Sequence, residues 1–373
     1  MVGKTGAPAR AANVVSAATA VLLATLAVVL CLCPAPSTAQ IHWIGMTPEP
    51  NDARNVSLFR LHRLGKRGED VARVMLENPG EAVAVDAFRC RPGGTFCLLL
   101  TSNGTASWLY NVSVVDGALT SRTTLQGVSA HNLHVDMASG AAYTIVQRPK
   151  YAAVARVYAG AVSIIVDLSS YLQSDGVIAT GSSTHCSDVQ TMWVGIRHAG
   201  ARDAIVHVDL KQQKIAGHLL LSDPLVTSMW AWCNDATRVN HLGGSTVITT
   251  TAKNNTGTNT GTKTRLAAYG LYDNQGRFQP QVTAPIPAHA PEYVMTALLS
   301  EPIGYGFFTA LYPNNATPGG PPTQGLLGFG NFVPPSQEAM VAATGGAVGA
   351  AVPNTKPLNL VPIDFFLTGA AVY

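Results

Sequence analysis

The sequence carries little charge. Asp, Glu, Lys and Arg make up only 12% of its 373 residues, and the formal net charge is +3. This scarcity excludes a long charged helix or coiled coil, and the 47% of hydrophobic residues excludes a disordered chain. Lysine and arginine form no cluster of the kind that neutralises a phosphate backbone, so we expect no nucleic acid among the partners.

Familiar catalytic motifs are also absent. The sequence has no Gly-x-Ser-x-Gly elbow, no His-Glu-x-x-His pair and no dinucleotide-binding glycine fingerprint. No cofactor is therefore expected. An active site assembled from separate loops would leave no such motif, so catalysis stays open, although a binding role is favoured.

The N-terminal segment has the pattern of an export signal. Residues 1–39 contain no acid and two early cations, followed by an apolar run at 14–32 and small residues at 37–39. We predict a signal peptide over 1–39, so that 40–373 is secreted. The alternative is an uncleaved anchor, because the apolar run approaches the ~20 residues that span a bilayer. Only in that case would the domain be held at a membrane.

Cysteines and sequons in the predicted mature chain fit an oxidising, extracellular compartment. Four cysteines remain beyond the leader, an even number. Cys90 and Cys97 flank a Pro-Gly-Gly turn and are predicted to pair, which leaves Cys186 and Cys233 as the second disulfide. Five Asn-x-Ser/Thr sequons predict a glycoprotein. They are Asn55, Asn103, Asn111, Asn254 and Asn315.

A repeated pattern runs from residue 57 to the C-terminus. Residues 134–147 show it best: a short strand, an acid that opens a glycine-containing turn, and a second β-branched strand. The pattern recurs about every 50 residues, a period typical of propeller blades. Two longer intervals contain polar inserts at 253–263 and 313–324, which are predicted to be loops. The repeated acids are Asp86, Asp136, Asp188, Asp235, Glu301 and Asp364.

Each unit predicts four antiparallel strands, A to D, because hairpin signals such as Asp116-Gly117 join two further β-rich runs. The C-terminal residues 360–373 supply only strands A and B. The N-terminal residues 57–76 supply strands C and D. The sequence therefore predicts an all-β domain over 40–373, a six-bladed β-propeller closed by N-terminal C/D strands with C-terminal A/B strands. A seven-bladed propeller is the runner-up, if an insert hides a further unit.

Residues 134–147 resemble the "VD-x-x-x-G-x-x-Y" repeats of the YVTN and NHL groups of secreted propellers. The resemblance covers 57–373 as a pattern. It implies a fold but no particular function, because binding proteins and enzymes share this repeat.

A metal site is one hypothesis for the polar residues of the repeat. His134, Asp136, His185 and Asp188 could hold a divalent cation in the central channel of a hydrolase or lactonase-like enzyme. A metal needs three or four convergent ligands, however, so turn capping by the acids and burial of the histidines are favoured. Trp230 and Trp232 are predicted to pack in the core, with an aromatic platform for a sugar or a peptide side chain as the alternative.

The favoured function is therefore that of a secreted or cell-surface glycoprotein. We expect it to bind an extracellular protein or glycan through loops on one face of the propeller, including the two inserts.

Overall fold

The computed structural model describes the chain in segments, which exclude the predicted signal peptide at 1–39. These segments are residues 43–48, 58–64, 70–76, 81–90, 94–136, 138–172, 176–232, 241–253, 259–286, 293–296, 306–313, 325–331, 359–363 and 369–372. No helix within them is long and apolar enough to cross a membrane.

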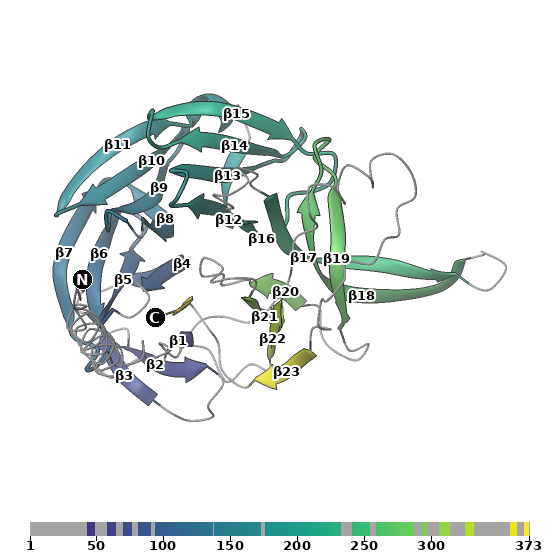
Figure 1. Ribbon diagram of the computed structural model, residues 1–373, viewed down its shortest axis with the longest axis horizontal. Helices are drawn as coiled ribbons and strands as arrows, with labels where there is room; N and C mark the ends of the chain where they lie inside the picture. Colours follow the sequence, from purple (N-terminus) through teal and green to yellow (C-terminus); the bar gives the residue numbers. More distant parts are fainter. Residues whose placement is uncertain are drawn as a thin grey trace, which may run out of the picture. The chain divides into compact units, whose positions relative to one another are not determined.

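The described segments form six four-stranded sheets, all with antiparallel neighbours, here numbered 1 to 6 (Figure 1). Sheet 1 has the order β24 (Gly369–Val372), β1 (Trp43–Pro48), β2 (Leu58–Leu64), β3 (Asp70–Met75). Sheet 2 has the order β4 (Ala82–Cys90), β5 (Phe96–Ser102), β6 (Ala106–Ser113), β7 (Leu119–Gln126). Sheet 3 has the order β8 (Ser129–Val135), β9 (Ala142–Arg148), β10 (Tyr151–Tyr158), β11 (Ala161–Asp167).

The remaining sheets follow in chain order. A single turn of helix, α2 (Ser169–Leu172), connects sheets 3 and 4. Sheet 4 has the order β12 (Gly176–Cys186), β13 (Thr191–His198), β14 (Ala204–Asp209), β15 (Lys214–Leu220). Sheet 5 has the order β16 (Ser228–Trp232), β17 (His241–Lys253), β18 (Asn259–Tyr272), β19 (Phe278–Pro285). Sheet 6 has the order β20 (Tyr293–Thr296), β21 (Gly306–Pro313), β22 (Gly325–Asn331), β23 (Asn359–Ile363).

Sheets 1 to 5 pack against each other in succession through their first strands, and sheet 6 contacts sheet 5 through β20 and β17. β24 contacts β4, β4 contacts β8, β8 contacts β12, and β12 contacts β16. Four clusters of buried apolar side chains fill the spaces between sheets 1 and 2, 2 and 3, 3 and 4, and 4 and 5. The core is therefore divided into layers between sheets, which is the packing of propeller blades. The prediction of an all-β chain built from four-stranded antiparallel units is confirmed.

The predicted hairpin at Asp116-Gly117 is also confirmed. Gly117 has a φ of 75°, and its N–H donates to the Ser113 carbonyl over 2.9 Å. A Cβ at this position would lie 1.9 Å from the carbonyl oxygen of Arg73 on β3, so only glycine fits.

The two ends of the chain share sheet 1, but they divide its strands differently from the prediction. β24 pairs with β1 in the register Trp43↔Val372. The N-terminal segment therefore supplies three strands and the C-terminal segment only one. β23, predicted to be strand A of the last unit, instead pairs with β22 as the fourth strand of sheet 6. The predicted two-plus-two division was wrong because β1, a short strand with two glycine or proline positions in six, gives no clear alternating pattern.

The insert at 253–263 was predicted to be a loop, which is wrong for residues 253 and 259–263, while 254–258 lie outside the described segments. Lys253 ends β17, and residues 259–263 begin β18, with Thr251 opposite Lys263 and Lys253 opposite Asn259. Threonine is β-branched and favours strands, so this polar segment lengthens the hairpin. The second insert, 313–324, lies outside the described segments except for Pro313 at the end of β21.

Candidate functional site

The two predicted site histidines meet between sheets 3 and 4. His134 on β8 and Ser183 on β12 are both buried, and His134 Nε2 lies 2.7 Å from Ser183 Oγ. The ring centroid of His185, also on β12, lies 6.1 Å from that of His134. It lies 5.3 Å from the ring centroid of Tyr143 on β9. The first strands of neighbouring sheets therefore bring these polar rings together.

These imidazoles lie in poorly solvated surroundings. Burial lowers the pKa of His134 well below its usual value, and the charges of Arg89 and His185 act in the same direction. Burial also lowers the pKa of His131, on the same strand, to about 4. The imidazoles of His131 and His134 are therefore neutral at neutral pH. His131 Nε2 is buried and has no hydrogen-bond partner in the part of the chain that the structure describes.

Asp136 caps the turn that follows β8. Its carboxylate accepts a hydrogen bond from the N–H of Ala138 over 3.1 Å and another from the hydroxyl of Ser139. Burial raises the pKa of Asp136, but these hydrogen bonds outweigh burial and hold that pKa below its usual value. The predicted Asx-turn is confirmed at this acid. Asp86 lies within β4, and its side chain is outside the described part of the chain.

The four predicted metal ligands do not gather at one point. Asp136 is bonded to its own turn, and Asp188 is exposed in the turn between β12 and β13. Among the described residues, no group of three or more His, Cys, Asp or Glu side chains is arranged to hold a metal ion. The other repeated acids, Asp235, Glu301 and Asp364, lie outside those residues.

The aromatic pair on β16 is described only at its first member. Trp230 is buried, and its indole lies against Gly243, where an added Cβ would come within 2.5 Å of the ring. This position matches the predicted packing role. The side chain of Trp232 lies outside the described part of the chain.

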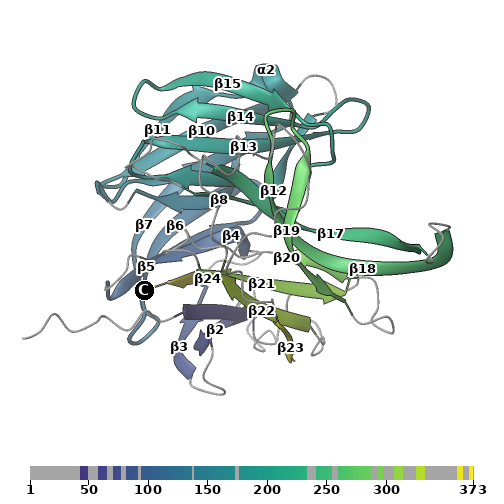
Figure 2. The ribbon, with the colours of Figure 1, turned by 45° about the vertical axis from the view of Figure 1, so that its right-hand side comes forward.

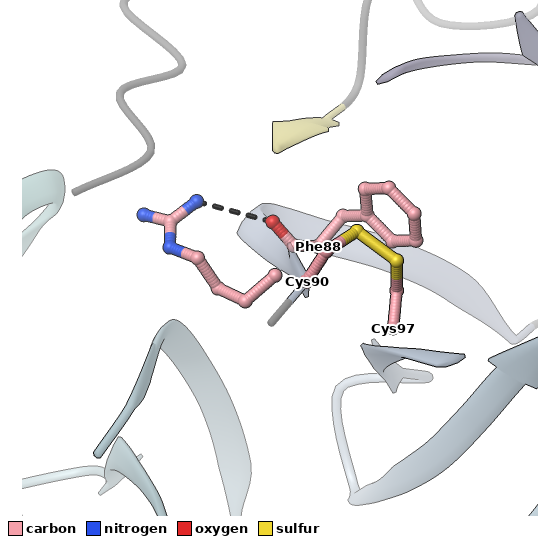
Figure 3. Close-up of a disulfide and its surroundings, with 4 residues drawn as sticks. Phe88, Cys90 and Cys97 are labelled. Atoms are coloured by element: carbon pink, nitrogen blue, oxygen red, sulfur yellow. Dashed lines mark hydrogen bonds between the residues drawn. A yellow bond between two sulfur atoms is a disulfide. The ribbon is translucent and has the colours of Figure 1, made fainter. Parts of the chain in front are cut away.

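The predicted disulfide between Cys90 and Cys97 is present. Cys90 and Cys97 are direct partners in the ladder of β4 and β5, with their Cα atoms 4.1 Å apart (Figure 3). Both are buried in the cluster between sheets 1 and 2. Cys186 is also disulfide-bonded. Its predicted partner, Cys233, lies outside the described segments.

Two of the five predicted glycosylation sites can be located. Asn103 is exposed in the turn between β5 and β6, where its carbonyl oxygen accepts hydrogen bonds from the N–H groups of Thr105 and Ala106. Asn111 lies on β6, inside sheet 2, and is partly buried. Asn55, Asn254 and Asn315 lie outside the described segments.

Sequence reasoning missed Asn132. This residue is fully buried on β8 with a φ of 57°, a left-handed conformation that asparagine tolerates. Its side chain accepts from the Gly181 N–H over 2.8 Å and donates to the Ala179 carbonyl over 3.3 Å. It thereby satisfies backbone groups at the register shift in β12. In the sequence, an asparagine next to a histidine does not predict a contact with a residue 47 positions away along the chain.

The hairpin of β17 and β18 extends beyond the rest of sheet 5 (Figure 2). Pairing of β16 with β17 ends at Ser245, and pairing of β18 with β19 begins at Leu266. Residues 246–253 and 259–265 therefore form a two-stranded ribbon, here called the threonine ribbon. No acid occurs between Asp235 and Asp273 in the sequence. The cations of that interval are Arg238, Lys253, Lys263 and Arg265.

The comparisons with known proteins give only distant likenesses. No protein-family model matches the chain, and no curated protein sequence matches it. A chain in a nidogen/laminin complex is 7% identical, with 89% of this chain and 98% of that chain covered and a TM-score of 0.45. The WD40 domain of Toxoplasma gondii coronin is 13% identical over 77% of this chain and 65% of that one, with a TM-score of 0.38. The C-terminal WD40 domain of Sif2 is 9% identical, with 88% of this chain and 87% of that chain covered and a TM-score of 0.39.

None of these TM-scores reaches 0.5. The fold class rests on the chain's own four-stranded antiparallel sheets, of which sheets 1 to 5 pack in succession through their first strands. They define this chain as a β-propeller protein.

Proposed function

We propose that this chain is a secreted or cell-surface glycoprotein that binds an extracellular protein or glycan. Its sheets are proposed to close into a ring of six blades, with sheet 1 joining the two ends of the chain. The order of contacts between successive sheets and the pairing of β24 with β1 support this closure. A closed ring removes most exposed sheet edges and gives a rigid support for a projecting binding element.

The threonine ribbon is the observation that carries the proposal. Its outer backbone groups have no neighbouring strand in the described chain, and its side chains include Thr249, Thr250 and Thr251, all exposed. An isolated two-stranded hairpin is only marginally stable in water, so an extension without a binding role would bring little benefit to the fold.

Charge indicates the chemistry of the partner. The ribbon contains Lys253, Lys263 and Arg265 but no acid. Cations near an exposed ribbon attract anionic groups and speed encounter with them. We therefore assign the partner to the anionic class, an acidic glycan or an acidic protein surface. Such a partner fits hydroxyl and cationic side chains without requiring a deep pocket.

The test uses the full chain expressed in secreting eukaryotic cells, with heparin as the anionic probe. N-terminal sequencing and glycosidase treatment of the product check secretion, leader removal and glycosylation. The variant Lys253→Gln with Lys263→Gln is expected to elute from immobilised heparin at clearly lower salt. Lys211→Gln with Lys214→Gln is the matched control, because these exposed lysines flank the hairpin between β14 and β15.

A second variant removes the ribbon itself. Thr249 and Arg265 are direct partners across the hairpin, so residues 250–264 can be replaced by an Asn-Gly turn. Loss of binding to both heparin and cell surfaces supports the proposal. Unchanged binding in this variant, with unchanged thermal stability, contradicts it.

A further inference from the structure

β11 forms the outer edge of sheet 3. It pairs with β10 and, among the described strands, with no other. In an antiparallel edge strand, every second residue directs its N–H and C=O groups away from the sheet, where another strand can bind them. β11 is therefore a ready acceptor for an added strand.

Most of the other outer strands carry central residues that block strand addition, and β15 carries a charge at its first position. Charged side chains and prolines are the usual protection of a sheet edge. In this chain the charged residues and prolines of the other outer strands are Asp70 and Arg73 in β3, Arg122 in β7, Lys214 in β15, Pro280 and Pro285 in β19, and Pro362 in β23. β11 contains no proline, and its only charged residue is Asp167 at its end. That carboxylate already accepts the Ser169 N–H over 2.7 Å.

A β-bulge does not distinguish this edge. β11 has a register shift against β10, but β3, β7, β15 and β19 have register shifts against their own partners as well. β11 and β15 are the two of these edges that lack both a central charge and a proline, because Lys214 is the first residue of β15. β11 differs from β15 in its two exposed β-branched apolar side chains, Val162 and Ile164.

The face of β11 toward sheet 2 offers uncovered apolar surface. Val162 is 40% exposed and Ile164 is 51% exposed. They are two residues apart and so point to the same face. Their cross-strand partners on β10, Val157 and Ala155, are buried in the core cluster between sheets 2 and 3. The side chains of Val162 and Ile164 therefore extend this apolar cluster to the outer edge of sheet 3, where they remain exposed to solvent.

The opposite face places a cation beside the edge. Ser163 on β11 lies opposite Arg156 on β10. The guanidinium carbon of Arg156 lies 5.1 Å from the ring centroid of Tyr158, which is 50% exposed. Its Nε atom is buried and has no hydrogen-bond acceptor in the described part of the chain. A carboxylate delivered next to Ser163 would lie on the same face as the Arg156 guanidinium and would attract its charge.

We propose that β11 is a docking edge for an extended segment of a partner protein, which adds to sheet 3 as a fifth strand. Apolar side chains of this segment pack on Val162 and Ile164, and an acidic side chain on its opposite face pairs with Arg156. The recognised pattern is thus apolar–acidic–apolar, with main-chain hydrogen bonds giving affinity and the alternate side chains giving specificity.

Charge favours a foreign segment over a second copy of this chain. The β11 strand of a second copy would carry Asp167 as its only acid, and that residue caps the turn before α2. Because one oxygen of that carboxylate already accepts the Ser169 N–H, Asp167 is a weaker partner for Arg156 than an unbonded acid of a foreign segment. An acidic partner segment satisfies the cation and covers the apolar face at the same time.

The test measures fluorescence anisotropy of a labelled heptapeptide, alternating valine and threonine with a central glutamate, against the full chain. We expect saturable binding that Ile164→Lys or Val162→Lys weakens about tenfold or more, because a lysine on the edge opposes strand addition. Leu220→Lys is the matched control, since Leu220 is 48% exposed on the outer strand of sheet 4. It should leave the affinity unchanged.

Arg156→Gln tests the charge pair. It should weaken binding about fivefold for the glutamate peptide but not for the same peptide with glutamine, as expected for one cross-strand ion pair. Arg148→Gln is the control, because Arg148 is stacked on Tyr151 at 4.6 Å in the same sheet.

Two outcomes overturn the proposal. One is peptide binding that is absent, or that Ile164→Lys leaves unchanged in a folded variant. The other is a dimer, seen by light scattering, that Ile164→Lys dissociates, which would make a second copy the occupant. The proposal does not rest on the threonine ribbon, so ribbon variants that abolish heparin binding should retain the peptide affinity.

Discussion

His134 and Ser183 join neighbouring sheets through one buried hydrogen bond, with Nε2 and Oγ 2.7 Å apart. His134 lies on the first strand of sheet 3 and Ser183 on the first strand of sheet 4. A neutral imidazole has one donor and one acceptor nitrogen, and a hydroxyl can act in either role, so the two groups satisfy each other without charge. This polar contact between first strands adds to the apolar cluster that packs sheets 3 and 4 together.

Removing either partner should destabilise the fold. His134→Ala or Ser183→Ala leaves the other group buried without a partner, which costs about 1–3 kcal/mol in free energy of unfolding. The double variant should lose clearly less than the sum of the two single losses. Urea unfolding followed by tryptophan fluorescence measures all three. His218→Ala, at an exposed position on β15, is the control and should stay within about 0.5 kcal/mol of the unmodified chain.

Asn132 has to adopt a left-handed backbone conformation and to make two side-chain hydrogen bonds, and two variants can separate these requirements. Asn132→Gly keeps access to the φ of 57° but loses the bonds to Gly181 and Ala179, so we expect a loss of about 1–3 kcal/mol. Asn132→Ala loses the same bonds and must also hold a left-handed conformation, which adds about 1 kcal/mol. Denaturant unfolding gives both values. Equal stability of the glycine variant and the unmodified chain would contradict the assigned role of these bonds.

The sequence allows the strand pattern to be predicted because hairpin turns are local. Asp116-Gly117 and the capped turn at Asp136 depend on residues within a few positions of each other. The bridge of Cys90 and Cys97 is local for the same reason. By contrast, β1 pairs on one side with β24 at the other end of the chain, and no local pattern specifies such a pairing.

The candidate site could be predicted only in part. His134 and His185 are recognisable because they recur in neighbouring units, and the structure does bring them together. Their hydrogen-bonding partners are not recognisable. Ser183 lies in the run Ser182-Ser183-Thr184, and only the register shift in β12 decides which hydroxyl faces His134.

Stability should fall as the pH drops below neutrality. The pKa of His131 is about 4 in the folded chain, against an unfolded value of 6.5. Between these values the unfolded chain binds a proton that the folded chain does not, so falling pH favours unfolding. His131 alone should remove about 3 kcal/mol across that interval, and the loss should level off below about pH 4. The lowered pKa of His134 acts in the same direction.

Urea unfolding at several pH values between about 7.5 and 5 checks this dependence, since ionisation of histidine dominates that range. His131→Phe removes the titrating group and should flatten the curve relative to the unmodified chain. His218→Phe is the control at an exposed position and should leave the slope unchanged. A stability that does not change over this range would contradict the buried neutral state of His131.

The disulfide between Cys90 and Cys97 should contribute moderately to stability because it closes a short loop. The two cysteines are seven positions apart and already partners in the ladder of β4 and β5. Loop-closure entropy for this length predicts that Cys90→Ser with Cys97→Ser lowers the free energy of unfolding by about 2 kcal/mol. Thermal unfolding of the two forms measures the loss, and peptide mapping without reduction checks the bond. If both thiols react with iodoacetamide in the denatured but unreduced protein, the bridge is absent.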